Sequence, residues 1–101
     1  MARRNQFTVD AESVQGEAGA EATFSCITIR EWREWRDDPK TTDEDLLSEH
    51  LVTWSGFVDD EGAELPSPKD EPLIVGELYI HEQRALVLLL LAGPDGESAK
   101  N

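Results

Sequence analysis

The chain has 101 residues, with 22 acidic against 9 basic side chains and a formal net charge of −13. This length suits a single domain with one modest hydrophobic core. The acidic excess argues against binding to a bare phosphate backbone or an anionic membrane, because like charges repel, and it favours basic or apolar protein surfaces as partners. We expect one small acidic domain over residues 1–94 and a disordered tail over residues 95–101.

The cysteine content and the apolar runs bear on the cellular setting. The single cysteine, Cys26, excludes an internal disulfide, and its apolar surroundings predict a core thiol. The basic start of the chain is not followed by an apolar segment, so we expect no signal peptide. The longest apolar run, residues 85–93, is far shorter than the ~20 residues of a membrane span. These features predict a reducing, cytosolic setting without membrane contact.

The first quarter of the chain predicts two strands. Residues 7–9 form a short apolar segment, and residues 22–27 alternate between apolar and polar side chains, which is typical of a half-buried strand. Residues 11–20, which contain two glycines, indicate a turn or mobile loop between them. Together these segments predict an antiparallel β-hairpin.

A short helix is predicted next. Thr28 and Glu31 have the spacing of a capping box, in which both side chains accept hydrogen bonds from amides at a helix start. Pro39 ends the helix, because the residue before a proline disfavours the helical conformation. Asp37 and Asp38 are unfavourable at the negative end of the helix dipole, so we expect this helix to be short.

A second helix is predicted after residue 41. Thr41 and Glu44 repeat the capping-box spacing. The apolar face of this helix has residues at positions i, i+4 and i+7, which are Leu47, Leu51 and Trp54. Gly56 is placed as the C-terminal cap. The acidic residues 59–61 and the glycine after them predict a small turn.

The last predicted element is a helix that starts after a proline-containing linker. Pro72 suits a first helical turn, where its missing N–H costs nothing. Gly76 disfavours helix, so we place the start near Glu77, and Gly93 and Pro94 end it. The predicted fold is therefore α+β and mostly helical: an N-terminal β-hairpin, then about three helices, with a small acidic turn between the second and the third.

No pattern in the sequence predicts catalysis, a cofactor or a metal site. His50 and His81 lack the spacing of a paired zinc motif. The acidic residues around Gly62 lack the glutamate that completes a calcium loop, so we expect a solvated turn. No nucleophile–base pair and no glycine-rich phosphate loop is present. We expect a protein that is not an enzyme.

The tryptophans are the most informative residues. Trp32 and Trp35 alternate with Arg33 and Arg36, and tryptophan and arginine are the residues most enriched in interface hot spots. Core packing is the alternative for these two tryptophans, and it is the favoured interpretation for Trp54. The four interleaved residues form the predicted partner-binding surface.

Three stretches resemble the small tail assembly chaperones of long-tailed bacteriophages. One is a strand that leads into the short helix "ITIREWREWR". Another is "LLSEHLVTWSGFVDDEGAELP", a helix with a hydrophobic-x-Trp-x-Gly ending, followed by an acidic turn and Leu-Pro. The third is the proline-led final helix. The resemblance covers about two-thirds of the chain, and the chain departs from it in the apolar run of residues 86–91.

This resemblance implies a non-enzymatic protein of the infected bacterial cytoplasm. Such chaperones keep the long tape-measure protein soluble and help deliver tail-tube subunits onto it. The net charge of this chain separately predicts no direct contact with nucleic acid or a membrane. Two alternatives stay open: an acidic nucleic-acid mimic that inhibits a host DNA-binding protein, and a structural phage head or tail component. The sequence also leaves a homo-oligomer possible.

Overall fold

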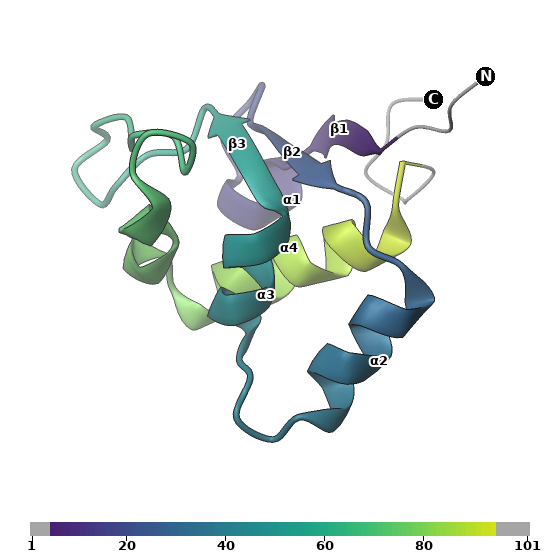
Figure 1. The fold of residues 1–101 in the computed structure, drawn as a ribbon. Helices are drawn as coiled ribbons and strands as arrows, with labels where there is room; N and C mark the ends of the chain where they lie inside the picture. Colours follow the sequence, from purple (N-terminus) through teal and green to yellow (C-terminus); the bar gives the residue numbers. More distant parts are fainter. Residues whose placement is uncertain (1–4, 95–101) are drawn as a thin grey trace.

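The computed structural model of the chain describes residues 5–94. Three antiparallel strands form a sheet in the order β1–β2–β3, over Gln6–Asp10, Glu21–Ser25 and Leu51–Ser55. The helices are α1 (Glu12–Gln15), α2 (Ile29–Asp37), α3 (Asp43–His50) and α4 (Ile80–Ala92), and a 3₁₀ helix, η1, covers Pro72–Glu77. In Figure 1, α1 and α4 lie behind the sheet, and α2 projects at the lower right. The predicted α+β class is confirmed, and the predicted tail, residues 95–101, lies outside the described residues.

β1 and β2 pair where the alternation pattern predicts. Their register places Phe7 opposite Phe24, and the two ring centroids are 5.5 Å apart on the buried face of the sheet. On the other face the Thr8 and Thr23 hydroxyls lie 2.7 Å apart and form a cross-strand hydrogen bond. The connection between the strands contains α1, a short helix where we expected only a turn or loop, and β3 extends the sheet beyond the predicted pair.

The C-terminal half of the second predicted helix is a strand instead. α3 ends at His50, and the chain passes directly into β3. Thr53 pairs with Thr23, whereas Leu51 pairs with Phe24, so Val52 is an extra residue in a β-bulge. The bulge turns both Leu51 and Trp54 toward the core, where each is 6% exposed. This three-residue spacing imitates a helical period, and the predicted helix through Trp54 is wrong for that reason.

The residues that start the helices agree with the sequence-based prediction in one case and differ from it in two. The capping box of α2 uses Thr28 and Glu31 as expected. The capping box of α3 uses Thr42 and Asp45, one residue later than predicted. Pro72 begins η1 and not the final helix, because the backbone is extended at Leu78 and Tyr79, and α4 starts only at Ile80.

The core lies between the sheet and the helices α1, α3 and α4. Its largest fully buried side chains come from β2, the segment after β3, α3, η1 and α4: Phe24, Phe57, Leu46, Leu47, Val75, Leu86 and Leu90. The Trp54 ring stacks on Phe57 with 4.5 Å between centroids, so the predicted core position of Trp54 is confirmed. Cys26 lies beyond the end of β2 and is exposed, so the prediction of a core thiol is wrong.

Gly56 is required by the close approach of two chain segments. Its φ is +78°, and a Cβ at this position would lie 2.9 Å from the Cα of Ala20. The residue does not cap a helix, as the sequence suggested. It follows β3 and lets the chain pass against the segment that leads into β2.

Substitution Gly56→Ala is expected to destabilise the fold by about 1–3 kcal/mol, because it adds a backbone clash to an unfavourable φ. Gly62→Ala is the matched control, since Gly62 has a φ of +84° but open space around its Cβ position. Urea unfolding of both variants measures the difference. Equal losses of stability would contradict the proposed close approach.

Candidate protein-binding surface

The capping box at the start of α2 fixes the first turn of this helix. The Thr28 N–H donates to Glu31 Oε1 at 2.8 Å, and the Glu31 N–H donates to Thr28 Oγ1 at 3.1 Å. The hydrogen bond from the Thr28 N–H lowers the pKa of the Glu31 carboxyl below its ordinary value of 4.5. The first turn of the helix is therefore held by an interaction local to its own sequence.

Trp35 connects α2 to the rest of the molecule. Its Nε1 donates to the Thr42 carbonyl at 2.9 Å, and the Thr41 hydroxyl donates to the Trp35 carbonyl at 2.7 Å. The ring is half-buried and packs against the core. No residue of α2 is fully buried, so Trp35 is the main side chain through which this helix contacts the core.

Trp32 and the arginines lie further out on α2. Trp32 is half-buried, and the Arg36 guanidinium lies 4.7 Å from its ring centroid, within the range of a cation–π interaction. Arg36 also forms a 3.0 Å ion pair with Asp37, and both of these side chains are largely exposed. Arg33 is exposed. The structure thus separates the four predicted residues: Trp35 faces the core, Trp32 and Arg36 stack at the surface, and Arg33 stands apart from them.

An apolar groove runs between α2 and the C-terminal end of α4. It has a volume of about 290 Å³, and we call it the α2–α4 groove; its lining residues are Ile27, Thr28, Ile29, Trp32 and Leu91. Ile29 is 67% exposed, and Leu88, one turn before Leu91 on α4, is 60% exposed. Ile29, Leu88 and Leu91 are surface residues that the sequence patterns did not predict. Leu88 and Leu91 belong to a run, residues 86–91, in which every side chain is apolar. The sequence therefore does not show which face of α4 is exposed.

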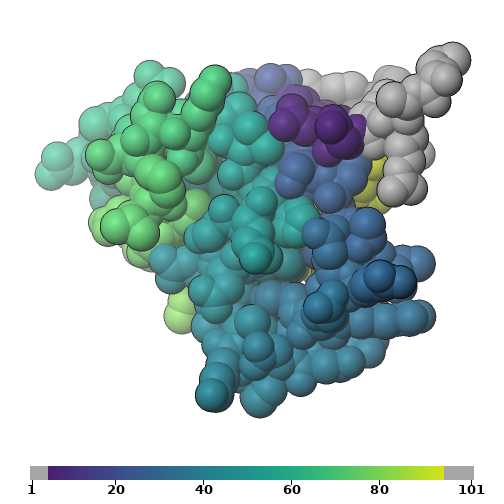
Figure 2. All heavy atoms as spheres, in the orientation of Figure 1, coloured from purple at the N-terminus to yellow at the C-terminus, as the bar shows by residue number. Residues whose placement is uncertain are grey.

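An acidic cleft lies on the neighbouring side of α2, where the helix faces α3. We call it the α2–α3 cleft. Its volume is about 610 Å³, and its lining residues are Glu31, Glu34, Trp35, Asp38, Thr41, Asp45, Ser48 and Glu49. On α2 the cleft residues follow positions i, i+3, i+4 and i+7, so they share one face of the helix. Figure 2 shows α2, in blue, standing out from this face of the molecule beside the teal residues of α3.

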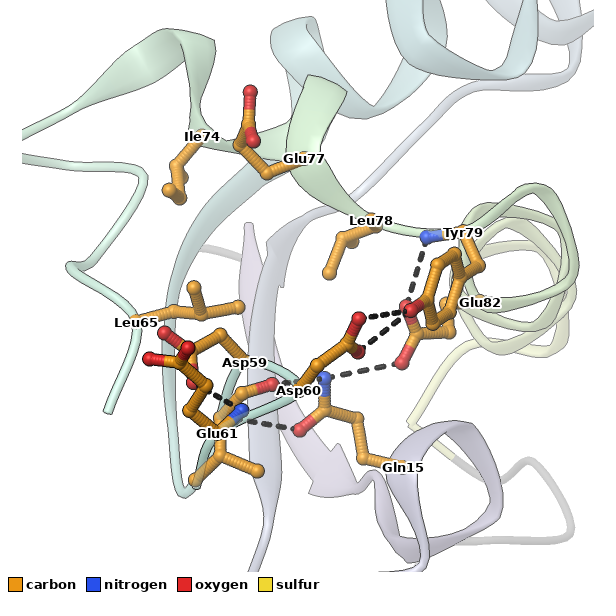
Figure 3. Close-up of a pocket in the computed structure, with 11 residues that line it drawn as sticks. Gln15, Asp59, Asp60, Glu61, Leu65, Ile74, Glu77, Leu78, Tyr79 and Glu82 are labelled. Atoms are coloured by element: carbon orange, nitrogen blue, oxygen red, sulfur yellow. Dashed lines mark hydrogen bonds between the residues drawn. The ribbon is translucent and has the colours of Figure 1, made fainter. Parts of the chain in front are cut away.

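A third cavity, of about 410 Å³, lies between the acidic turn, η1 and the start of α4. Figure 3 shows that its polar side chains bond to one another. Gln15 Nε2 donates to Glu82 Oε2 and to the Val58 carbonyl, each at 3.1 Å, and the Tyr79 N–H donates to Glu82 Oε1 at 2.8 Å. These bonds join α1, the acidic turn and α4, so the buried Glu82 has a structural role here.

Tyr79 and Asp60 close the outer side of this third cavity. The Tyr79 hydroxyl donates to the Asp60 carboxylate, at 2.6 Å from Oδ1 and 2.5 Å from Oδ2. This hydrogen bond raises the pKa of the tyrosine above its ordinary value of 10.0. Asp59 also bonds, since its Oδ1 accepts from the Glu61 and Ala63 amides at 2.9 Å. The predicted solvated turn is thus ordered by its own carboxylates.

Residues 5–94 hold no group of three or more histidine, cysteine, aspartate or glutamate side chains placed to bind a metal ion. Over the same residues, no helix is long and apolar enough to cross a membrane.

Comparison of the chain with protein-family models, curated proteins and solved structures finds no match. No family is assigned on this basis, and the resemblance to tail assembly chaperones stays a prediction. The features of the described residues that bear on function are the groove and the cleft on either side of α2.

The single tyrosine of the chain makes its titration simple to follow. We expect the tyrosinate absorbance of the native protein to appear at higher pH than in the unfolded chain, because ionisation of Tyr79 breaks its bond to the Asp60 carboxylate. Asp60→Asn should return the midpoint toward the ordinary tyrosine value. An unchanged midpoint in this variant would show that Asp60 does not cause the shift.

The capping box of α2 predicts that the stability of the protein decreases as the pH falls into the acid range. The pKa of Glu31 is lowered in the folded state, so its contribution to stability is complete above the unfolded pKa and is lost as the pH falls through the folded pKa. Parent protein and Glu31→Gln should therefore differ in urea midpoint at neutral pH and converge in acid. A difference that does not depend on pH would contradict this origin.

Proposed function

We propose that this protein is a binding protein of the phage tail assembly chaperone type, which holds a protein partner on α2 and the α2–α4 groove. One observation carries the proposal. α2 has no fully buried residue: its Ile29 is 67% exposed, and its Trp32 is half-buried at the edge of the groove. A helix that served only the fold would turn its apolar side chains to the core.

The free energy of burial supports a contact surface at this place. Covering a large apolar side chain contributes about 1.5–3 kcal/mol, and adjoining exposed apolar residues are typical of interaction sites. Ile29 and Trp32 adjoin Leu91 across the groove, and Leu88 extends the apolar surface along α4. Trp32 is already stacked with Arg36, so part of its orientation is set before a partner binds.

The biological setting of the proposal follows the sequence resemblance. The partner would be the tape-measure protein, whose apolar helices must stay soluble during assembly. The protein would also contact tail-tube subunits and help deliver them onto the tape-measure protein. The action is non-catalytic and takes place in the cytoplasm of the infected bacterium. The net charge of −13 supports a chaperone role, because mutual repulsion keeps the complexes from associating with one another.

One observation favours the alternative of a nucleic-acid mimic. The α2–α3 cleft gathers five carboxylates, from Glu31, Glu34, Asp38, Asp45 and Glu49. A mimic would bind a host DNA-binding protein in competition with DNA, and its binding would not depend on Trp32. A structural head or tail component would use the same apolar surface as a chaperone but would remain in the purified virion.

The test is retention of a tape-measure fragment by the immobilised protein. Trp32→Ala should weaken retention about 30-fold or more, which is the loss of ~2 kcal/mol typical of a hot-spot tryptophan. Leu73→Ala is the matched control, since Leu73 is 83% exposed on η1 and lies outside the groove. Failure of the parent protein to retain the fragment, or equal weakening by both variants, would overturn the proposal.

A further inference from the structure

We propose that the partner segment held in the α2–α4 groove is both apolar and acidic. A large apolar side chain fills the groove, and aspartate or glutamate side chains beside it pair with Arg33 and Arg36. This inference rests on the proposed function and specifies the chemistry of the bound segment. It depends on three observations: the face of α2 on which the two arginines lie, the place of the carboxylates on other faces, and the donors that the fold leaves available.

The outward face of α2 combines apolar residues of the groove with two arginines. Ile29, Trp32, Arg33 and Arg36 follow positions i, i+3, i+4 and i+7, so they share one face of the helix. Ile29 and Trp32 line the groove, and the Arg36 guanidinium lies 4.7 Å from the Trp32 ring centroid. Arg33 is one turn from Ile29 and one turn from Arg36. A side chain bound against Ile29 and Trp32 therefore has positive charge beside it.

The carboxylates of α2 lie on other faces of the helix. Glu31 and Glu34 line the α2–α3 cleft, on the far side of Trp35, which packs against the core. Glu31 is in addition bonded within the capping box. The residues that line the groove include no acidic side chain. The negative charge of the chain is therefore not concentrated on the face that the partner meets, and charge complementarity selects carboxylates for the occupant.

The fold leaves the two arginines available to a partner. Within residues 5–94, the exposed Arg33 side chain makes no hydrogen bond or ion pair. Arg36 uses its Nε to pair with Asp37 at 3.0 Å, and the outer nitrogens of its guanidinium keep their donors. Arg84, by contrast, pairs with Asp43 across α4 and α3 at 2.8 Å. In a chain with 22 acidic against 9 basic side chains, an arginine without a carboxylate partner beside an apolar groove indicates a carboxylate from outside.

The net charge of −13 is compatible with an acidic segment at this face but disfavours a nucleic acid. The chain repels anions at long range, yet salt screens exposed charges beyond ~8–10 Å, whereas ion pairs act at ~4 Å or less. A single strand of nucleic acid also stacks on tryptophan and pairs with arginine. It has a charge on every nucleotide, so the chain repels it more strongly than a segment with a few carboxylates.

The experiment uses the full chain and synthetic peptides that share the same leucines. The residues beside the leucines are glutamate in one peptide, glutamine in a second and lysine in a third, and a fourth keeps the glutamates but has serine in place of leucine. A single-stranded oligonucleotide is the control for general anion binding. Calorimetry gives the dissociation constants. We expect the glutamate peptide to bind most tightly, and Ile29→Ser, at a 67% exposed position, to weaken every leucine peptide without unfolding the chain.

Two matched double variants separate the arginines from overall charge. The readout is the ratio of the glutamine to the glutamate dissociation constant, because loss of the Arg36–Trp32 contact affects both peptides alike. Arg33→Gln/Arg36→Gln should lower this ratio by about 2-fold to 30-fold, the range for two surface ion pairs. Lys40→Gln/Lys69→Gln removes the same charge at exposed residues outside the groove and should leave the ratio nearly unchanged. Arg33→Glu/Arg36→Glu should make the lysine peptide the tightest.

The outcomes distinguish this inference from the proposed function. If the parent protein retains the tape-measure fragment but the two glutamine double variants give the same ratio, the acidic flank is wrong and the proposed function stands. If the fragment is not retained but the glutamate peptide binds most tightly, the chemistry of the face is supported and the proposed function fails. Tighter binding of the oligonucleotide than of the glutamate peptide would overturn the inference. So would a dimer of the chain that Arg33→Gln/Arg36→Gln dissociates, because a second copy would then cover the face.

Discussion

The direct passage of α3 into β3 is the constraint on which the arrangement of this domain depends. His50 ends the helix and Leu51 begins the strand, with no loop between them. His50 Nδ1 lies 3.1 Å from the Ser25 hydroxyl and 3.2 Å from the Ser25 carbonyl, so the junction is bonded to the end of β2. β2 leads into α2, and α2 returns into α3. The junction therefore fixes the end of β2, from which α2 starts, relative to α3, and Trp35 bonds the far part of α2 to the segment before α3. The helix lies beside the core without being inserted into it.

Local chemistry made part of the fold predictable from the sequence. The alternation in β1 and β2 and the capping box at Thr28 depend on residues close together in the chain, and both are found where expected. β3 depends on a partner far away in sequence, because only its register with β2 shows that Val52 is an extra residue. Without that register, the three-residue spacing of Leu51 and Trp54 indicates one face of a helix. A β-bulge and a helix give the same spacing over three residues, and tertiary pairing decides between them.

The candidate surface, too, was only partly predictable from the sequence. Composition alone pointed to Trp32 and Trp35, since tryptophan beside arginine is typical of interfaces. The two residues nevertheless act differently: the Trp35 indole is bonded to the Thr42 carbonyl, while Trp32 lines the groove. The contribution of α4 could not be predicted. In residues 86–91 every side chain is apolar, and exposure of Leu88 follows only from how α4 packs.

The construction of α2 explains how an exposed helix can serve as a binding surface. Its shape is stabilised locally by the capping box at Glu31 and by the Arg36–Trp32 contact. Its position depends on few contacts, chiefly those of Trp35. In the proposed complex a partner would meet a surface that is already helical, so little conformational entropy of α2 would be lost on binding. Because α2 buries no residue completely, its outward side chains are free to change without loss of core packing. Substitutions on this helix can therefore alter its surface while the sheet and α4 maintain the fold.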